Sequence, residues 1–143
     1  MRLASEALAV SLGQRWKTAP MSTRVVALDH VQLAMPKGGE TEAEAFYCKV
    51  LGFTVLPKPE PLASRGGRWF VCGDVQVHLG VEQDFRPARK AHPALRVDGF
   101  DELVGKLGDL GASWRFDEDL PGVRRLYVDD PFGNRIEVID ADG

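Results

Sequence analysis

The sequence predicts an α+β fold made of two βαβββ modules. Three observations lead to this prediction. The order of predicted strands and helices repeats once along the chain. Each half contains one amphipathic helix that ends at a glycine, and short strands of alternating polarity precede and follow each helix. The chain has 143 residues, 44% of them hydrophobic, which is enough for one globular domain but not for two unrelated full-size domains.

The first module is predicted to span about residues 25–83. An alternating strand over Ala27–Met35 is followed by a helix over Thr41–Leu51 and then by three extended runs. The helix ends at Gly52. Its apolar residues recur at helical spacing and form one stripe that a sheet can cover, namely Ala43, Phe46, Tyr47, Val50 and Leu51.

The second module is predicted to span about residues 91–140. It repeats the order of the first, with a strand that begins at His92, a helix over Asp98–Leu110 that ends at Gly111, and three further runs. The apolar stripe of this helix consists of Phe100, Leu103, Val104, Leu107 and Leu110. The two modules together form a single predicted domain over residues 25–143.

Residues 1–24 are predicted to be a disordered N-terminal extension, or a segment that precedes a true start at Met21. No run is long enough to span a membrane, and Glu6 interrupts the apolar stretch that a secretory signal would need. The net charge of −3 argues against a nucleic-acid partner. Two cysteines outside any C-x-x-C pair indicate a reducing, cytoplasmic location.

Four potential metal ligands fall on one predicted face of the strands. Side chains alternate faces along a strand, so His30, His78, His92 and Glu137 each lie opposite the apolar residues that meet a helix. A single strand histidine is more often a surface residue than a ligand. These are, however, the only three histidines of the chain, and all three share the polar face with a glutamate.

Neutral imidazoles and a carboxylate suit one divalent transition metal, which could be Fe, Mn, Ni, Co or Zn. Glu137 also has a distinctive context, because the predicted turn Asp130–Asn134 contains Pro and Gly and leads directly into its strand. The sequence therefore predicts a metal site formed by the four residues above.

Further polar and aromatic residues are predicted to line the same cleft and to bind substrate. Arg96 and Arg135 share the parity of the ligands, and the seventh strand contains Arg124 and Arg125 beside Tyr127. Arginine offers a fork of donors to carboxylate or phosphate, which favours an anionic, oxygen-rich substrate; pairing with surface Asp and Glu is the equal alternative. Trp69 is expected either to wall the pocket or to pack in the core.

The sequence resembles the vicinal-oxygen-chelate superfamily, which includes glyoxalases, bleomycin-resistance proteins and extradiol dioxygenases. The resemblance covers about residues 25–140 and rests on the strand with His30 and on the segments Ala45–Phe53, Val75–Leu79, Ala91–Val97 and Asp130–Glu137. It implies an eight-stranded curved mixed sheet around a cleft, a homodimer, and a metal held by His30, His92 and Glu137.

His78 occupies the remaining ligand position, where glyoxalase I has a glutamate, so only Glu137 could serve as a catalytic base. The resemblance implies a metal-dependent enzyme, either a glyoxalase-like lyase or isomerase or a dioxygenase, that acts on a small oxygen-rich substrate. The alternative is a metal-free drug-binding or resistance protein of the same fold. A partner-binding module with an incidental metal is the third possibility.

Overall fold

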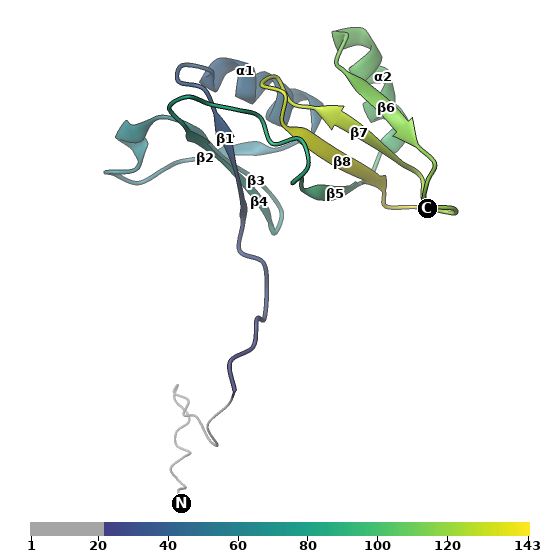
Figure 1. Cartoon of the computed structure of the whole chain (residues 1–143), viewed down its shortest axis with the longest axis horizontal. Helices are drawn as coiled ribbons and strands as arrows, with labels where there is room; N and C mark the ends of the chain where they lie inside the picture. Colours follow the sequence, from purple (N-terminus) through teal and green to yellow (C-terminus); the bar gives the residue numbers. More distant parts are fainter. Residues whose placement is uncertain (1–21) are drawn as a thin grey trace, which may run out of the picture.

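A computed structural model describes residues 22–143, which form two βαβββ modules (Figure 1). The first module contains β1 (Val31–Met35), α1 (Glu40–Glu44), the π-helix η1 (Ala45–Val50), β2 (Thr54–Leu56), the short 3₁₀ helix η2 (Ala63–Arg65), β3 (Arg68–Cys72) and β4 (Val75–Val81). The second contains β5 (Ala94–Val97), α2 (Phe100–Leu110), β6 (Trp114–Asp117), β7 (Arg125–Asp129) and β8 (Arg135–Asp140). The predicted α+β fold with repeated modules is confirmed.

The two modules have the same strand topology. The strand orders are β1-β4-β3-β2 and β5-β8-β7-β6, with β1 parallel to β4, β5 parallel to β8, and all other pairs antiparallel. The eight predicted strands thus form two four-stranded sheets, and within residues 22–143 no backbone ladder joins them. The first strand of each module therefore lies at an open edge of its sheet.

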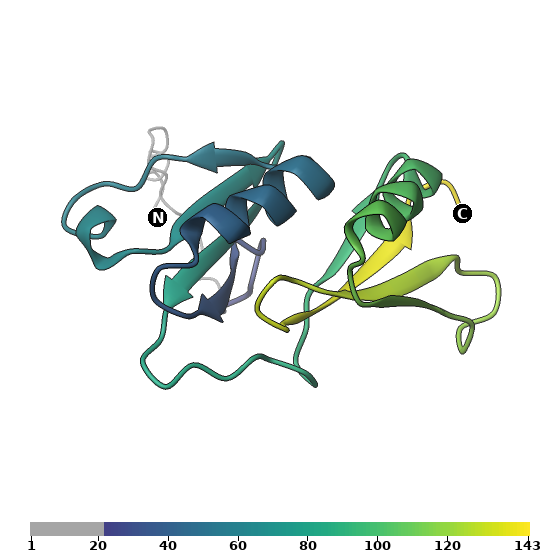
Figure 2. The same ribbon diagram turned by 90° about the horizontal axis from the view of Figure 1, so that it is seen from above.

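Each helix covers one face of its own sheet (Figure 2). In the first module Tyr47 stacks on Phe70 with ring centroids 5.1 Å apart and contacts Phe53 at its edge. In the second module the buried helix residues Phe100, Leu103 and Leu107 face the buried strand residues Leu126, Val128, Ile136 and Val138. Full burial of each such side chain stabilises the fold by about 1.5–3 kcal/mol. The opposite face of each sheet is left for polar residues.

The helix boundaries differ slightly from the predicted ones. The first helix starts at Glu40 and continues from α1 into η1, so the predicted range Thr41–Leu51 is nearly correct but its second half has π geometry. The second helix starts at Phe100 and not at Asp98, because Gly99 adopts a left-handed φ of 72°. Both helices bury most of the predicted apolar stripe, but Leu110 at the end of the second helix is 63% exposed.

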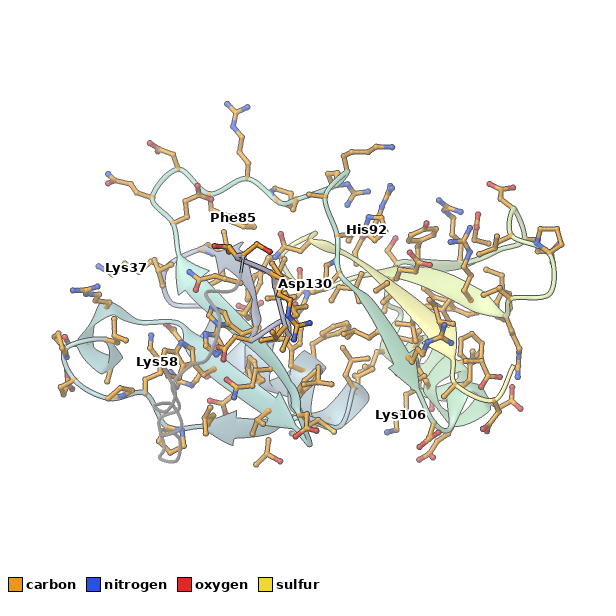
Figure 3. All side chains as sticks on the ribbon, turned by 90° about the horizontal axis from the view of Figure 1, so that it is seen from below. Lys37, Lys58, Phe85, His92, Lys106 and Asp130 are labelled. Carbon is orange, nitrogen blue, oxygen red and sulfur yellow. The ribbon has the colours of Figure 1, made fainter. Side chains whose placement is uncertain are left out.

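A buried hydrogen-bond network joins the modules around the turn Asp130–Asn134. The Tyr47 hydroxyl donates to Asp130 Oδ2 at 2.8 Å, and Asn134 Nδ2 donates to the same oxygen and to the Ala34 carbonyl, both at 2.9 Å. Asn134 Oδ1 accepts from the Ala88 amide of the connecting segment at 2.9 Å. Figure 3 shows Asp130 between the two modules. The network fixes β8, and therefore Glu137, relative to β1 in the other module.

Residues 22–30 run as an extended segment away from the two modules (Figure 1). Val25, Val26 and Leu28 are between 77% and 89% exposed, which is unusual for three large apolar side chains within four consecutive residues. The predicted strand Ala27–Met35 is therefore paired only from Val31 onward. Most of the predicted N-terminal extension lies outside the described residues, and no helix of residues 22–143 has the length and apolar character to cross a bilayer.

Candidate functional site

The first module presents a stack of three aromatic rings on its polar face. His78 on β4 lies opposite Trp69 on β3, and its ring stacks between Trp69 and His30 with centroid distances of 4.3 Å and 4.0 Å. His78 is 5% exposed, and its Nε2 lies 3.0 Å from Gln76 Oε1. Burial lowers the pKa of His78, and the neighbouring His30 lowers it further. The neutral form of His78, which is the form that can bind a metal, is therefore favoured.

The sequence analysis placed His30 within a strand, but in the structure it lies immediately before β1. Its Nδ1 is 2.8 Å from Asp29 Oδ2, so this nitrogen is the donor in that contact. The Nε2 lone pair is then available to a ligand. A carboxylate behind a metal-binding imidazole is a common arrangement, because it fixes the tautomer and increases the basicity of the other nitrogen.

The second module presents His92 and Glu137. His92 precedes β5 and does not open it, because Pro93 intervenes and the ladder to β8 begins at Ala94, opposite Glu137. His92 Nε2 lies 3.1 Å from Glu137 Oε1, and His92 Nδ1 lies 2.9 Å from the Lys90 carbonyl oxygen. Both ring nitrogens thus face acceptors. The ring satisfies both only as an imidazolium, or with a cation in place of the Nε2 proton.

Arg125 holds the other oxygen of Glu137. Arg125 Nη1 donates to Glu137 Oε2 at 2.9 Å, and Arg125 Nη2 forms an ion pair with Asp117 on β6. Burial alone would raise the pKa of Glu137, but the hydrogen bonds from Arg125 and His92 outweigh this effect, and its pKa lies below the ordinary value. Glu137 is therefore an ionised carboxylate with one oxygen directed to His92.

Tyr127 is surrounded by guanidinium groups. The guanidinium carbons of Arg115, Arg135 and Arg125 lie 5.0, 5.4 and 5.7 Å from the centre of the Tyr127 ring, and His92 meets the same ring edge-on at 5.4 Å. Asp117 compensates Arg115 and Arg125, whereas Arg135 has no carboxylate at ion-pair distance within residues 22–143. This face of the second module carries positive charge that is available to an anion.

One of the predicted substrate-binding arginines, Arg124, lies away from this face. Arg124 contacts Asp101 and Asp140 and lies over the Phe100 ring, on the helix side of the sheet. It therefore does not face Glu137, because neighbouring residues of a strand point to opposite faces. Arg96 lies on the same sheet face as Arg125, because both are register partners of Ile139. It is exposed on β5 and lines a groove between the modules.

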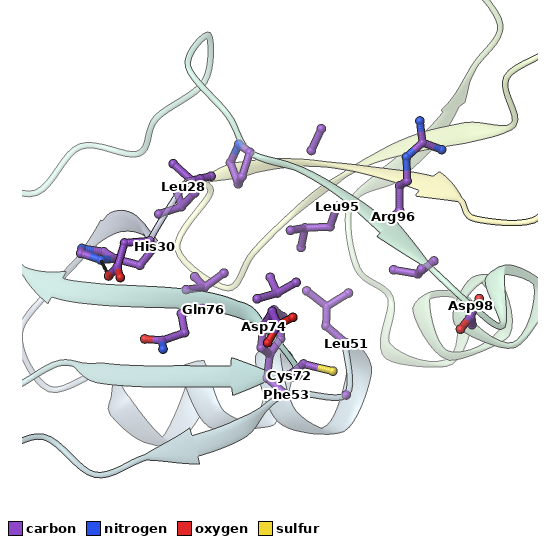
Figure 4. Close-up of a pocket in the computed structure, with 18 residues that line it drawn as sticks. Leu28, His30, Leu51, Phe53, Cys72, Asp74, Gln76, Leu95, Arg96 and Asp98 are labelled. Carbon is purple, nitrogen blue, oxygen red and sulfur yellow. Dashed lines mark hydrogen bonds and ion pairs between the residues drawn. The ribbon is translucent and has the colours of Figure 1, made fainter. Parts of the chain in front are cut away.

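The groove has a volume of about 650 Å³ and is mostly apolar (Figure 4). It runs between the edge strands of the two modules, with Leu28, His30 and Gln76 on one side and Leu95 and Arg96 on the other. The groove is large enough for a small organic molecule.

The four predicted ligands form two pairs in one chain and not a single cluster. His30 contacts His78 in the first module, and His92 contacts Glu137 in the second. Across residues 22–143, no three His, Cys, Asp or Glu side chains lie together as a metal site. The sequence analysis placed Arg125 beside Tyr127 in the seventh strand but did not single out Arg115 or Asp117, which lie on β6 opposite Tyr127 and Arg125.

Comparison with known proteins identifies the family. The model of the glyoxalase-like domain matches residues 32–139, which is most of the chain and spans both modules. The chain belongs to the glyoxalase-like domain family. The similarity also places this glyoxalase-like protein in the vicinal-oxygen-chelate superfamily, as its resemblance predicted.

Solved structures agree with this assignment. A Bacillus anthracis protein assigned to the glyoxalase family is 48% identical, with a TM-score of 0.78 over 84% of this chain and 98% of the other. A glyoxalase/dioxygenase from Nostoc punctiforme is 22% identical, with a TM-score of 0.65 over 84% of this chain and 98% of the other. A fosfomycin resistance protein from Listeria monocytogenes is 15% identical, with a TM-score of 0.65 over 82% and 95%. The last two share the fold, and among curated proteins none matches this glyoxalase-like chain.

Proposed function

We propose that the protein is a metal-dependent enzyme that acts on a small, oxygen-rich, anionic substrate. The observation that carries this proposal is the pair His92 and Glu137, whose Nε2 and Oε1 atoms lie 3.1 Å apart. Metal–ligand distances of about 2.0–2.2 Å put two adjacent ligand atoms about 3 Å apart on the same ion. The acceptors at both nitrogens of His92 favour a cation at this position.

The proposed ligand set is completed by His30 and His78 of the first module. Their imidazoles match His92 in chemistry, and a set of three imidazoles and one carboxylate suits Fe, Mn, Ni, Co or Zn. The ion would supply Lewis acidity toward the substrate oxygens. Glu137 would act as the base, since it is the only carboxylate in the set.

The division of the ligands supports a homodimer in which the first module of one chain faces the second module of its partner. Within residues 22–143 the edge strands β1 and β5 are both unpaired on one side, and the ligands His30 and His92 lie just before these two strands. An open sheet edge is a ready surface for pairing with another chain. The exposed apolar residues of segment 25–28, which continue β1, provide further surface for such a contact.

The proposed substrate site is the arginine-rich face around Tyr127. Arg135 and Arg115 supply donors for a carboxylate or phosphate group, and Tyr127 supplies a flat apolar surface between them. Trp69 closes the other side of the proposed site, because it stacks directly on His78. Arg96, which is exposed in the groove, would meet the part of the substrate that extends beyond the metal.

Metal analysis tests the proposal. Protein purified without chelator, or reloaded with each of the five metals, is expected to bind close to one ion per chain, and both His92→Ala and Glu137→Gln are expected to lower the occupancy sharply. Glu102→Gln is the matched control, because Glu102 is an exposed carboxylate on α2 whose side chain is 76% accessible. Equal occupancy in Glu137→Gln and Glu102→Gln would contradict the ligand set. Light scattering tests the dimer, and a monomer at micromolar concentration would contradict it.

A second function, metal-free binding of a small molecule, is favoured by two observations. The groove between the modules is mostly apolar, and no three metal-binding side chains meet within the described part of one chain. In that case the protein would take up none of the five metals, yet small oxygen-rich acids would still raise its Tm. Metal uptake that depends on His92 would exclude this alternative.

A further inference from the structure

We propose that Arg125 is a positioning residue that turns Glu137 so that only Oε1 faces the metal site, and that Asp117 is the counter-charge that makes this possible. The inference rests on the proposed function and deepens it. It concerns two residues that lie outside the proposed ligand set.

The geometry forms a chain of contacts across three strands. Tyr127 on β7 is the register partner of Glu137, and Arg125, two residues earlier on β7, lies on the same face. Asp117 on β6 is the register partner of Arg125. The guanidinium uses one nitrogen for Glu137 and the other for Asp117. The three side chains are only 14%, 10% and 8% accessible, in the order Arg125, Glu137, Asp117. Contacts with so little solvent access hold their orientation better than surface ion pairs.

The contact at Oε2 determines what Glu137 can offer to an ion. A free carboxylate can rotate, or bind an ion through both oxygens. With Oε2 held at 2.9 Å by Arg125, Glu137 offers one oxygen, and that oxygen already lies beside His92. Arg125 therefore fixes both the rotation of Glu137 and the number of coordination positions it takes, which leaves positions for substrate.

Asp117 reduces the repulsion that the positive charge of Arg125 would exert on a metal ion. An arginine paired only with Glu137 would cancel the charge that attracts the metal. Here Arg125 also pairs with Asp117, which Arg115 contacts as well, so the positive charge of Arg125 is shared between two carboxylates and does not act on Glu137 alone. Lysine could not replace this arrangement, because its single ammonium lacks the planar fork that reaches two carboxylates.

Arg124 offers a matched control within the same sequence. It also contacts two carboxylates, Asp101 and Asp140, but it points to the helix side of the sheet. Arg124→Gln and Arg125→Gln thus remove the same group from adjacent positions, and only the second affects Glu137.

The test is a competition titration with Co(II) on the full-length protein, with the visible spectrum recorded at saturation. Arg125→Gln is expected to weaken Co(II) binding about 10–100-fold, as the loss of an outer-sphere partner typically does. Arg125→Lys is expected to remain about tenfold weaker than the parent despite its charge, and Asp117→Asn is also expected to bind more weakly. The Co(II) bands of Arg125→Gln are expected to lose intensity, because a two-oxygen Glu137 raises the coordination number. Arg124→Gln is expected to match the parent.

The outcomes separate this inference from the proposed function. If the parent binds Co(II) and Arg125→Gln binds it equally well with the same spectrum, the positioning role is wrong and the metal site stands. If Arg125→Lys restores full affinity, charge alone is responsible and the positioning role is again wrong. A parent that binds no metal overturns both proposals. Should Arg125→Gln fail to give the far-UV circular dichroism of the parent, Arg125→Lys and Asp117→Asn carry the test.

Discussion

Replacement of Asn134 by alanine should destabilise the protein more than any other single change of a polar side chain in the inter-module network. Asn134 is the only asparagine of the chain and is fully buried. Its amide makes three hydrogen bonds of 2.9 Å, to the Ala34 carbonyl, the Ala88 amide and the Asp130 carboxylate. These partners belong to β1, to the segment between the modules and to the turn before β8.

The expected cost follows from these contacts. A net contribution of about 1 kcal/mol for each hydrogen bond gives a loss of about 3 kcal/mol, and Ala34 and Ala88 are left with unsatisfied backbone groups. An unfolding entropy of about 2.1 cal/mol/K per residue over roughly 120 ordered residues corresponds to about 4 °C per kcal/mol. Asn134→Ala should therefore lower Tm by about 12 °C.

Urea unfolding followed by circular dichroism, together with a thermal scan, measures both quantities. Gln83→Ala is the control, because it removes the amide of an exposed turn residue and should change stability by less than about 0.5 kcal/mol. A loss below about 1 kcal/mol for Asn134→Ala would refute the reasoning. It would mean that water or a local shift satisfies the groups that Asn134 leaves.

Three further predictions concern single positions. Because burial lowers the pKa of His78 in the folded protein, the unfolded chain binds a proton at His78 more readily, and stability should fall as pH drops below about 6.5. The fall in Tm from pH 7 to pH 5 should be smaller in His78→Phe than in the parent. An equal fall in both proteins would show that other groups cause it. Gly67→Ala should cost more than about 2 kcal/mol in urea unfolding, since Gly67 has a φ of 85° and a Cβ there would overlap the Leu79 carbonyl oxygen. Gly105→Ala should instead stabilise the protein by about 1 kcal/mol, because its Cβ would meet open space on the exposed side of α2. A loss of stability would contradict the placement of Gly105 on the exposed side of that helix.

The faces of the strands were predictable from the sequence, and their ends were not. Alternation placed His78 and Glu137 opposite the helices, as the structure has them, because burial of Val77 and Ile136 fixes the other face. The start of β5 depends on where β8 pairs with it, and this long-range contact leaves no signal in the residues around His92. The π geometry of η1 was hidden for a similar reason, since its apolar stripe fits either kind of helix.

The candidate site was predictable as a set of residue types but not as a set of contacts. Parity puts Arg125 and Tyr127 on one face, yet it cannot say which guanidinium reaches Glu137 or that Asp117 holds it from the next strand. Parity also assigns Arg124 and Arg125 to opposite faces only where both belong to an extended run, and the sequence does not show that β7 begins at Arg125. The assignment of ligands to two separate pairs depends on how the modules face each other, which is a property of the tertiary structure.

The division of the ligands into one pair per module has a thermodynamic consequence. On the proposed site, an ion that bridges modules of two chains binds the dimer and not the separate subunits, so metal loading and association become linked equilibria. The apparent affinity for metal would then rise with protein concentration, and chelation would promote dissociation of the subunits. In a dilute cell extract the same chain could be metal-free, while at high expression it would be loaded.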